Sequence, residues 1–251
     1  MSKNENKEMM GIKGLRGFAL IFPAQEDIKS KRKEITLKDL VFYPGSWKIK
    51  NLDKVTGGKL NLIYENDSLR EFRIILDYNK RVGNRIVNTS IKIDAFQSRK
   101  GYIVAIDCPS FLIYTVASLI SLCIYGNING FYARKFEKED FLKIWDYAIK
   151  LGGIPREIHL RRIKGNKVSI YHVTGQDILG VEEIGNPVKL MRMARKIKRL
   201  GFSFPPGCLD ESPFHFWVAD WGGGTIYEPL QLLPHHALIL AEFFKRALEQ
   251  P

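Results

Sequence analysis

Short apolar stretches, rich in β-branched and aromatic residues, dominate the N-terminal third of the chain. Three of them, at 14–23, 59–65 and 69–78, are separated by segments that contain Gly, Pro and Asn. Such runs between turn-forming residues are typical of β-strands. We therefore predict three strands here, with a polar basic loop at 27–34 and a short helix in the segment ITLKDLVFY.

Two helices are predicted from the middle of the chain. Residues 111–125 carry no charge, and Pro109 before them and Gly126 after them suit a helix start and a helix end. This helix would span about 22 Å, less than the roughly 30 Å of a bilayer core, so we expect a buried helix and no membrane contact. A second helix at 137–151 has apolar residues at helical spacing and ends at a Gly pair.

The remaining pattern completes an α+β fold with a mixed or antiparallel sheet packed by helices. The segments NTSIKIDAF and GYIVAID read as paired strands, and IHLRRI and VSIYHV read as a hairpin closed by Gly165 and Asn166. A C-terminal helix is expected at 238–248. The turn-rich segment 79–84 suggests a boundary. We expect a disordered tail at 1–10, a β-rich subdomain at 11–84 and an α+β domain at 85–251.

Composition indicates a globular protein of the cytoplasm. Of the 251 residues, 45% are hydrophobic and 26% are charged. The three cysteines have no CxxC spacing, which argues against a disulfide framework, and no apolar segment succeeds the basic start as it would in a signal peptide. Abundant Ile, Lys and Arg with few Gln point to a thermophile.

Positively charged residues strongly outnumber negatively charged ones. The chain has a formal net charge of +12, which favours an anionic partner. Six cations and no carboxylate fall within 189–199. A helical wheel of 189–201 places the apolar residues on one face and these cations on the other. Like charges four residues apart destabilise a helix, so we expect a phosphate-binding surface rather than a merely solvated face. Its residues are Lys189, Arg192, Arg195, Lys196, Lys198 and Arg199.

A second cationic surface is expected on the hairpin that begins near residue 158. Strand alternation places His159 and Arg161 on one face and Ile158 and Leu160 on the other. A polar outer face of an ordinary hairpin remains the alternative. The expected phosphate-binding residues of this surface are Arg161, Arg162, Lys164 and Lys167.

Seven aromatic residues and the sequences PPG and GGG occur in the segment 202–227, which we expect to be a loop. Aromatic side chains beside cations can stack on nucleic-acid bases. They also suit core or subunit packing, so a homodimeric protein-interaction module that uses these aromatics and the helix at 238–248 stays an alternative.

Residues 111–198 resemble half of a LAGLIDADG-type DNA-binding domain. The segment VASLISLCIYGNING stands in place of that family's central helix and its acidic turn, and DFLKIWDYAIKLGG resembles the second helix. The run YHVTGQDILGVEEIGNPVKL resembles the hairpin strand and the segment after it, which contains Ile-Gly and then Pro and Lys. Asn127 and Asn129 occupy the turn where the family has its metal-binding acid. The resemblance implies a DNA-binding sheet without nuclease chemistry.

Catalytic signals are weak. Asp94 and Asp107 end strand-like runs and could bind the metals of a nuclease, which is the alternative enzymatic hypothesis. Five scattered residues could ligate a single metal ion, but their spacing fits no known pattern, and we expect capping and packing instead. They are Cys208, His215, Asp220, His235 and His236.

The sequence therefore predicts a basic, non-catalytic protein that binds DNA or RNA, alone or within a nucleoprotein particle. Its phosphate contacts are expected on the cationic helix and the hairpin. No cofactor and no metal are expected. A metal-dependent nuclease and a homodimeric interaction module remain the alternatives.

Overall fold

The computed structural model describes residues 15–98, 101–163, 170–175, 178, 186–227 and 234–249. The chain forms two compact units. Unit 1 is built mainly from Lys135–Ile239 and the residues from Phe243 onward, and unit 2 from Phe18–Arg134 with Leu240–Glu242. Both combine antiparallel strands with helices, so the α+β class is confirmed, although strands dominate.

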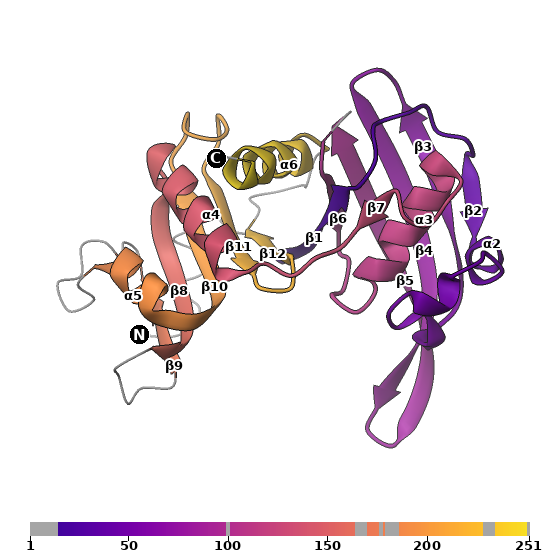
Figure 1. Cartoon of the computed structure of the whole chain (residues 1–251), viewed down its shortest axis with the longest axis horizontal. Helices are drawn as coiled ribbons and strands as arrows, with labels where there is room; N and C mark the ends of the chain where they lie inside the picture. Colours follow the sequence, from indigo (N-terminus) through magenta and orange to yellow (C-terminus); the bar gives the residue numbers. More distant parts are fainter. Residues whose placement is uncertain are drawn as a thin grey trace. The chain divides into compact units, whose positions relative to one another are not determined.

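Unit 2 contains a sheet with the strand order β2-β3-β4-β5-β6-β1, and β7 pairs with β1 beyond it. Its 3-10 turns are η1 (Ser46–Lys48) and η2 (Leu52–Lys54). Figure 1 shows α3 lying across one face of the sheet. The strands and helices are β1 (Leu15–Pro23), β2 (Glu34–Thr36), α2 (Leu37–Val41), β3 (Val55–Glu65), β4 (Leu69–Val82), β5 (Arg85–Ser98), β6 (Ile103–Ile106), α3 (Ile113–Tyr125) and β7 (Phe131–Tyr132).

The charge-free helix is α3, and its predicted burial is confirmed: every residue of it except Tyr114 is buried. Among the described residues, no helix has both the length and the apolar character that crossing a membrane requires. The strands predicted at 59–65 and 69–78 are also present, inside longer strands β3 and β4. The short helix within ITLKDLVFY is α2.

The boundary expected at 79–84 is wrong. These residues close the hairpin between β4 and β5, which pair without interruption from Leu69 opposite Ser98 to Val82 opposite Arg85. The turn formers there end a hairpin that extends well past α3 (Figure 1) rather than a domain. The division between the units instead falls between Arg134 and Lys135. The tail expected at 1–10 lies outside the described residues.

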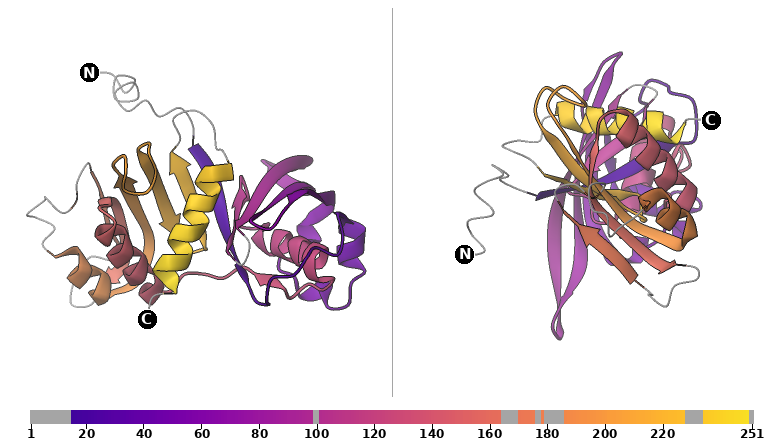
Figure 2. Two further views of the ribbon diagram at one scale, coloured as in Figure 1. Left: turned by 90° about the horizontal axis from the view of Figure 1, so that it is seen from above. Right: turned by 90° about the vertical axis from the view of Figure 1, so that its left-hand side faces the viewer.

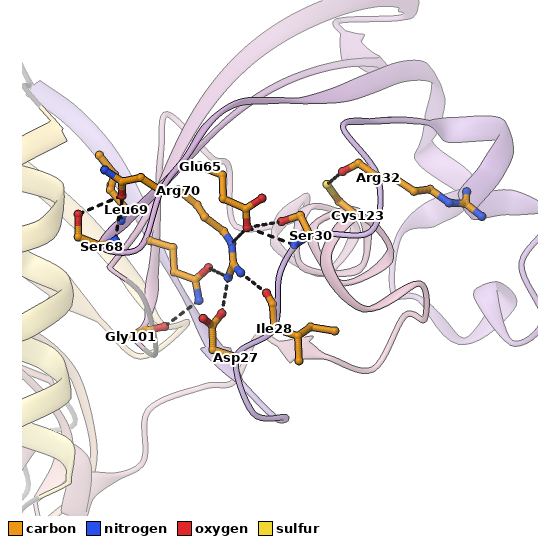
Figure 3. A network of polar contacts seen from close by, with 12 residues as sticks. Asp27, Ile28, Ser30, Arg32, Glu65, Ser68, Leu69, Arg70, Gly101 and Cys123 are labelled. Carbon is orange, nitrogen blue, oxygen red and sulfur yellow. Dashed lines mark hydrogen bonds and ion pairs between the residues drawn. The ribbon is translucent and has the colours of Figure 1, made fainter.

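Unit 2 holds a fully buried arginine (Figure 3). The Nε of Arg70 donates to Glu65 Oε1 at 2.7 Å, and its Nη1 donates to Gln97 Oε1 at 3.0 Å and also to the carboxylate of Asp27. Its Nη2 donates to the carbonyl of Ile28. Because a buried charge needs such partners, this cluster fixes the segment around Asp27 against the sheet.

Unit 1 contains a sheet with the strand order β12-β11-β10-β8-β9. The helices among its described residues lie on one face of this sheet (Figure 2, left). The predicted C-terminal helix is α6, and the predicted helix at 137–151 is α4, with Phe141, Ile144, Trp145 and Ala148 buried as expected. The elements are α4 (Lys138–Lys150), β8 (Ile154–Ile163), β9 (Ile170–Thr174), α5 (Pro187–Met193), β10 (Ala194–Phe204), β11 (Phe214–Ala219), β12 (Gly223–Tyr227) and α6 (Pro234–Leu248).

The helix predicted at 189–201 is wrong beyond Met193. Helix α5 ends there, and Ala194–Phe204 form β10, the central strand of unit 1. Ile197 and Leu200 are buried and three residues apart, as on a helix. They share one face of a strand because the pairing with β8 shifts register between Ile197 and Arg199. This bulge reproduces a helical spacing within a strand.

The segment 202–227, expected to be a loop, forms the end of β10 and the strands β11 and β12. Its phenylalanines pack under the helices. The ring of Phe202 lies 5.8 Å from that of Trp145 in α4, and the ring of Phe216 lies 5.2 Å from that of Phe243 in α6. Phe202, Phe204, Phe214 and Phe216 belong to the core of unit 1 and are not available for stacking on a base.

Candidate nucleic-acid interface

The face of the unit 1 sheet opposite the helices is polar and cationic. Residues directly across an antiparallel pair point to the same side of the sheet. His159 therefore shares a side with Arg199 on β10, and Gly201 shares it with Glu157 on β8 and Trp217 on β11. The predicted alternation on β8 is confirmed, with Ile158 and Leu160 buried toward the helices. We call this surface the open face. No helix among the described residues covers it.

Arg199 lies at the middle of the open face. Its guanidinium carbon is 3.9 Å from the ring centroid of Trp217, and its Nη1 donates to Glu157 Oε1 at 3.2 Å. Its side chain remains 37% exposed. A guanidinium held over an indole is fixed in position while it remains partly exposed, which suits the recognition of a phosphate.

Gly201 creates a depression beside this pair. A Cβ at Gly201 would lie 2.9 Å from the Cβ of Glu157 and 3.4 Å from the Cβ of Trp217, so a side chain there would fill the space. The resulting cavity has a volume of about 350 Å³. Its walls include Arg156, Ser203, His215, Trp217 and Tyr227.

Arg156 is held at the edge of this cavity. Its Nε donates to Ser203 Oγ at 2.7 Å, and Ser203 Oγ lies 2.7 Å from His215 Nδ1. Burial, followed by the nearby charge of Arg156, lowers the pKa of His215, so the neutral ring can accept the serine proton. Within the described part of the chain the terminal amino groups of Arg156 have no hydrogen-bond partner, and a bound anion could provide one.

His159 on β8 and His172 on β9 extend the open face. Their rings lie 4.9 Å apart, and His172 Nε2 is 2.9 Å from Glu157 Oε1. Burial lowers the pKa of His159, and the neighbouring His172, Arg161 and Arg199 lower it further. His159 Nε2 is buried without a partner among the described residues.

The predicted phosphate-binding residues that the structure describes fall into three groups. Arg199 and Arg161 lie on the open face; Lys196, opposite Arg161, and Lys198 both bind Asp220 Oδ2 at 2.8 Å. Burial raises the pKa of Asp220, but the hydrogen bonds from the two lysines outweigh it and the pKa is lowered overall. Four others are exposed: Lys189, Arg192, Arg195 and Arg162. Lys164 and Lys167 lie outside the described residues.

Glu157 and Ser203 of the open face were not predicted, and Trp217 was expected only as one of the seven aromatics of the segment 202–227. Glu157, Ser203 and Trp217 are separated in sequence, and only the register of three strands brings them together. A signal was present in β11, where buried Phe214 and Phe216 alternate with His215 and Trp217. The expectation of a loop at 202–227 overlooked that alternation.

The alternative catalytic residues form no evident metal site. Asp94 is paired with Arg73 and Lys92, both at 3.1 Å. Asp107 comes directly after β6, with a φ of 59°. In the described segments, no group of three or more His, Cys, Asp or Glu side chains is arranged to hold a metal ion.

Two of the scattered candidates, His235 and His236, are adjacent on α6. Both contact the carboxylate of Asp210, His235 Nε2 at 3.1 Å and His236 Nε2 at 3.2 Å. They lie at the first turn of α6, and a carboxylate with two oxygens can reach both rings. Their role is to fix the loop that contains Asp210 against the helix.

The region 111–198 is divided between the units, because the boundary after Arg134 separates α3 from α4. Comparison with models of known families and with curated proteins finds no match to the chain. The LAGLIDADG resemblance therefore stays a resemblance, and the function must be inferred from the residues themselves.

Proposed function

We propose that this chain binds nucleic acid, DNA or RNA, through the open face of unit 1, without catalysing a reaction on it. The observation that supports this most strongly is the arrangement around the cavity. There Arg199 is stacked on Trp217, and the terminal amino groups of Arg156 are available nearby. Cations fixed beside an aromatic ring are what a polynucleotide needs, with phosphates on the arginines and bases against the ring.

The charges of the surroundings support the same ligand. Among the described residues, the open face carries Arg156, Arg161 and Arg199 beside Glu157, whose carboxylate is already engaged by His172 and Arg199. Exposed cations continue from it along β10 and onto α5, including Arg195 and Arg192. With a net charge of +12, the whole chain attracts polyanions.

The two alternatives have less support. The nuclease needs Asp94, whose carboxylate is already paired with two cations. The homodimeric module relied on the aromatics of 202–227 and on the last helix. Four of those aromatics, Phe202, Phe204, Phe214 and Phe216, are buried within unit 1. Phe243 of α6 packs on two of them.

The test is equilibrium binding to labelled duplex DNA, single-stranded DNA and structured RNA over a salt series. Arg156→Gln combined with Arg199→Gln should weaken binding of the preferred ligand by at least about tenfold, because hydrogen bonds to charged groups contribute about 1.5–3 kcal/mol each. It should also reduce the slope of log affinity against log salt by about 1 to 2.

The matched control removes the same charge from α5, as Lys189→Gln with Arg192→Gln. It should reduce affinity less, because these exposed side chains lie away from the cavity. A larger loss in the α5 variant would move the interface from the sheet to the helix. Equal and unaltered binding by both variants, or no binding by the unaltered chain, would refute the proposal.

A further inference from the structure

Unit 2 presents two large aromatic side chains to water. Phe42, at the end of α2, is 83% exposed, and Trp47, in η1, is 78% exposed. Aromatic side chains of this size are normally buried or used for binding, since each offers a large contact area. Neither contributes to the core of unit 2, so their exposure calls for another explanation.

The segment that carries them is well anchored. Leu37 and Leu40 of α2 are buried, and the helix begins with a capping box between Thr36 and Asp39. After the helix, Ser46 Oγ donates to the carbonyl of Val41 at 2.8 Å, which ties η1 to the end of α2. Phe42 and Trp47 are therefore displayed by a fixed turn, which lowers the entropy lost when a ligand binds.

A groove lies beside this turn. It has a volume of about 570 Å³ and is lined by residues of the turn, of α3 and of the segment around β7. Two lysine–aromatic pairs border it. Lys48 Nζ lies 5.0 Å from the ring centroid of Trp47, and Lys50 Nζ lies 5.7 Å from that of Tyr114. Asn129 and Tyr132 add hydrogen-bonding groups to the lining.

The chemistry of the groove fits a single-stranded nucleic acid. Residues 38–54 contain four lysines and two aspartates. One of the two aspartates, Asp39, already accepts the backbone N–H of Thr36 in the helix cap. Exposed rings beside lysines allow bases to stack while phosphates are neutralised. The groove beside these rings is concave and its lining is partly polar, which suits a nucleotide better than an acyl chain.

We infer that this turn and the groove beside it form a second nucleic-acid site, in which an unpaired base stacks on Trp47 outside the groove and the adjoining phosphates lie on Lys48 and Lys50, which line it. For its ligand class the inference rests on the proposed function, but its residues are separate from the open face. It implies that a nucleic acid bound by unit 1 also binds to unit 2, or that the protein binds two nucleic-acid molecules.

The test uses the full chain and a labelled single-stranded oligonucleotide. Phe42→Ser with Trp47→Ser should lower affinity by about tenfold, because one stacked base is lost. The control, Val82→Ser with Ile86→Ser, removes exposed apolar side chains from the hairpin tip, where they are 56% and 74% exposed, and should leave affinity unchanged. Trp47→Phe should also remove part of the tryptophan fluorescence quenching caused by the oligonucleotide.

The outcomes separate this inference from the proposed function. If the open-face variant loses binding and the Phe42/Trp47 variant binds like the unaltered chain, the groove inference is wrong and the proposed function stands. If no oligonucleotide binds at all, both fail. If the Phe42/Trp47 change abolishes sedimentation with phosphatidylserine vesicles but not oligonucleotide binding, the surface serves a membrane and the inference is wrong.

Discussion

Two arginines on interior strands have similar partners but different roles, one in the fold and one in the proposed binding of a ligand. Arg70 on β4 is completely buried, and four groups accept its hydrogen bonds: Glu65, Gln97, Asp27 and the carbonyl of Ile28. Arg199 on β10 has one carboxylate partner and an indole beneath it, and its side chain is 37% exposed. A saturated arginine holds the fold together. A partly satisfied arginine at the surface is ready for an anion.

The comparison is tested most severely at Arg70. Replacing it with Met should destabilise unit 2 by about 3–5 kcal/mol, because Asp27 and Glu65 would lose the cation that compensates their buried charge. Denaturant unfolding would measure the loss. Arg199→Met should destabilise unit 1 much less, but it should lower the affinity for nucleic acid more. Equal destabilisation by the two variants would contradict the division between a structural and a ligand-binding arginine.

Neighbouring residues of β11 offer the next test. Phe216 is 1% exposed and packs on Phe204 and Phe243, so Phe216→Ala should cost about 3–5 kcal/mol of stability. Trp217 points to the open face, and Trp217→Ala should cost only about 1 kcal/mol, the size of an exposed cation–π contact. It should instead weaken single-strand binding about tenfold.

Thermal unfolding and a binding titration on both β11 variants would decide this point. The opposite pattern, with Trp217→Ala unfolding unit 1 and leaving binding intact, would mean that the open face is part of a core.

The smallest expected effect concerns pH. The folded pKa values of His159 and His215 are lowered by burial, so the unfolded chain binds more protons than the folded one below the ordinary His pKa of about 6.5. Their stabilising contribution is present above that pH and is lost as the pH falls through the folded values. Thermal unfolding between pH 8 and 5 should show this loss.

His215→Gln should make the pH dependence of stability shallower. A pH profile that is the same with and without His215 would show that this open-face histidine is not held neutral by the fold.

Much of the fold could be predicted from local patterns. The charge-free helix α3, the amphipathic helix α4 and the long strands β3 and β4 carry clear periodicities over many residues. The pattern failed where a bulge placed Ile197 and Leu200 at helical spacing on a strand. It also failed at 79–84, because turn formers mark a hairpin end as readily as a domain boundary.

The candidate site was predictable only in part. Charge density alone pointed to Arg161 and Arg199, but it could not distinguish them from Lys196 and Lys198, which are engaged by Asp220. Strand register decides which side chains meet, and it depends on long-range pairing that no local pattern contains. Gly201 illustrates this, since its importance lies in two neighbours from other strands, Glu157 and Trp217.

The central claim is that nucleic acid lies on the open face of unit 1, and photo-crosslinking tests it most directly. A single-stranded oligonucleotide carrying 5-iodouracil would be irradiated with the full chain, and the crosslinked residues identified by mass spectrometry. We expect crosslinks at Trp217 or Tyr227, with the yield reduced in the Arg156→Gln/Arg199→Gln variant. Crosslinks that avoid β8, β10, β11 and β12, at a yield unaffected by that variant, would contradict the claim.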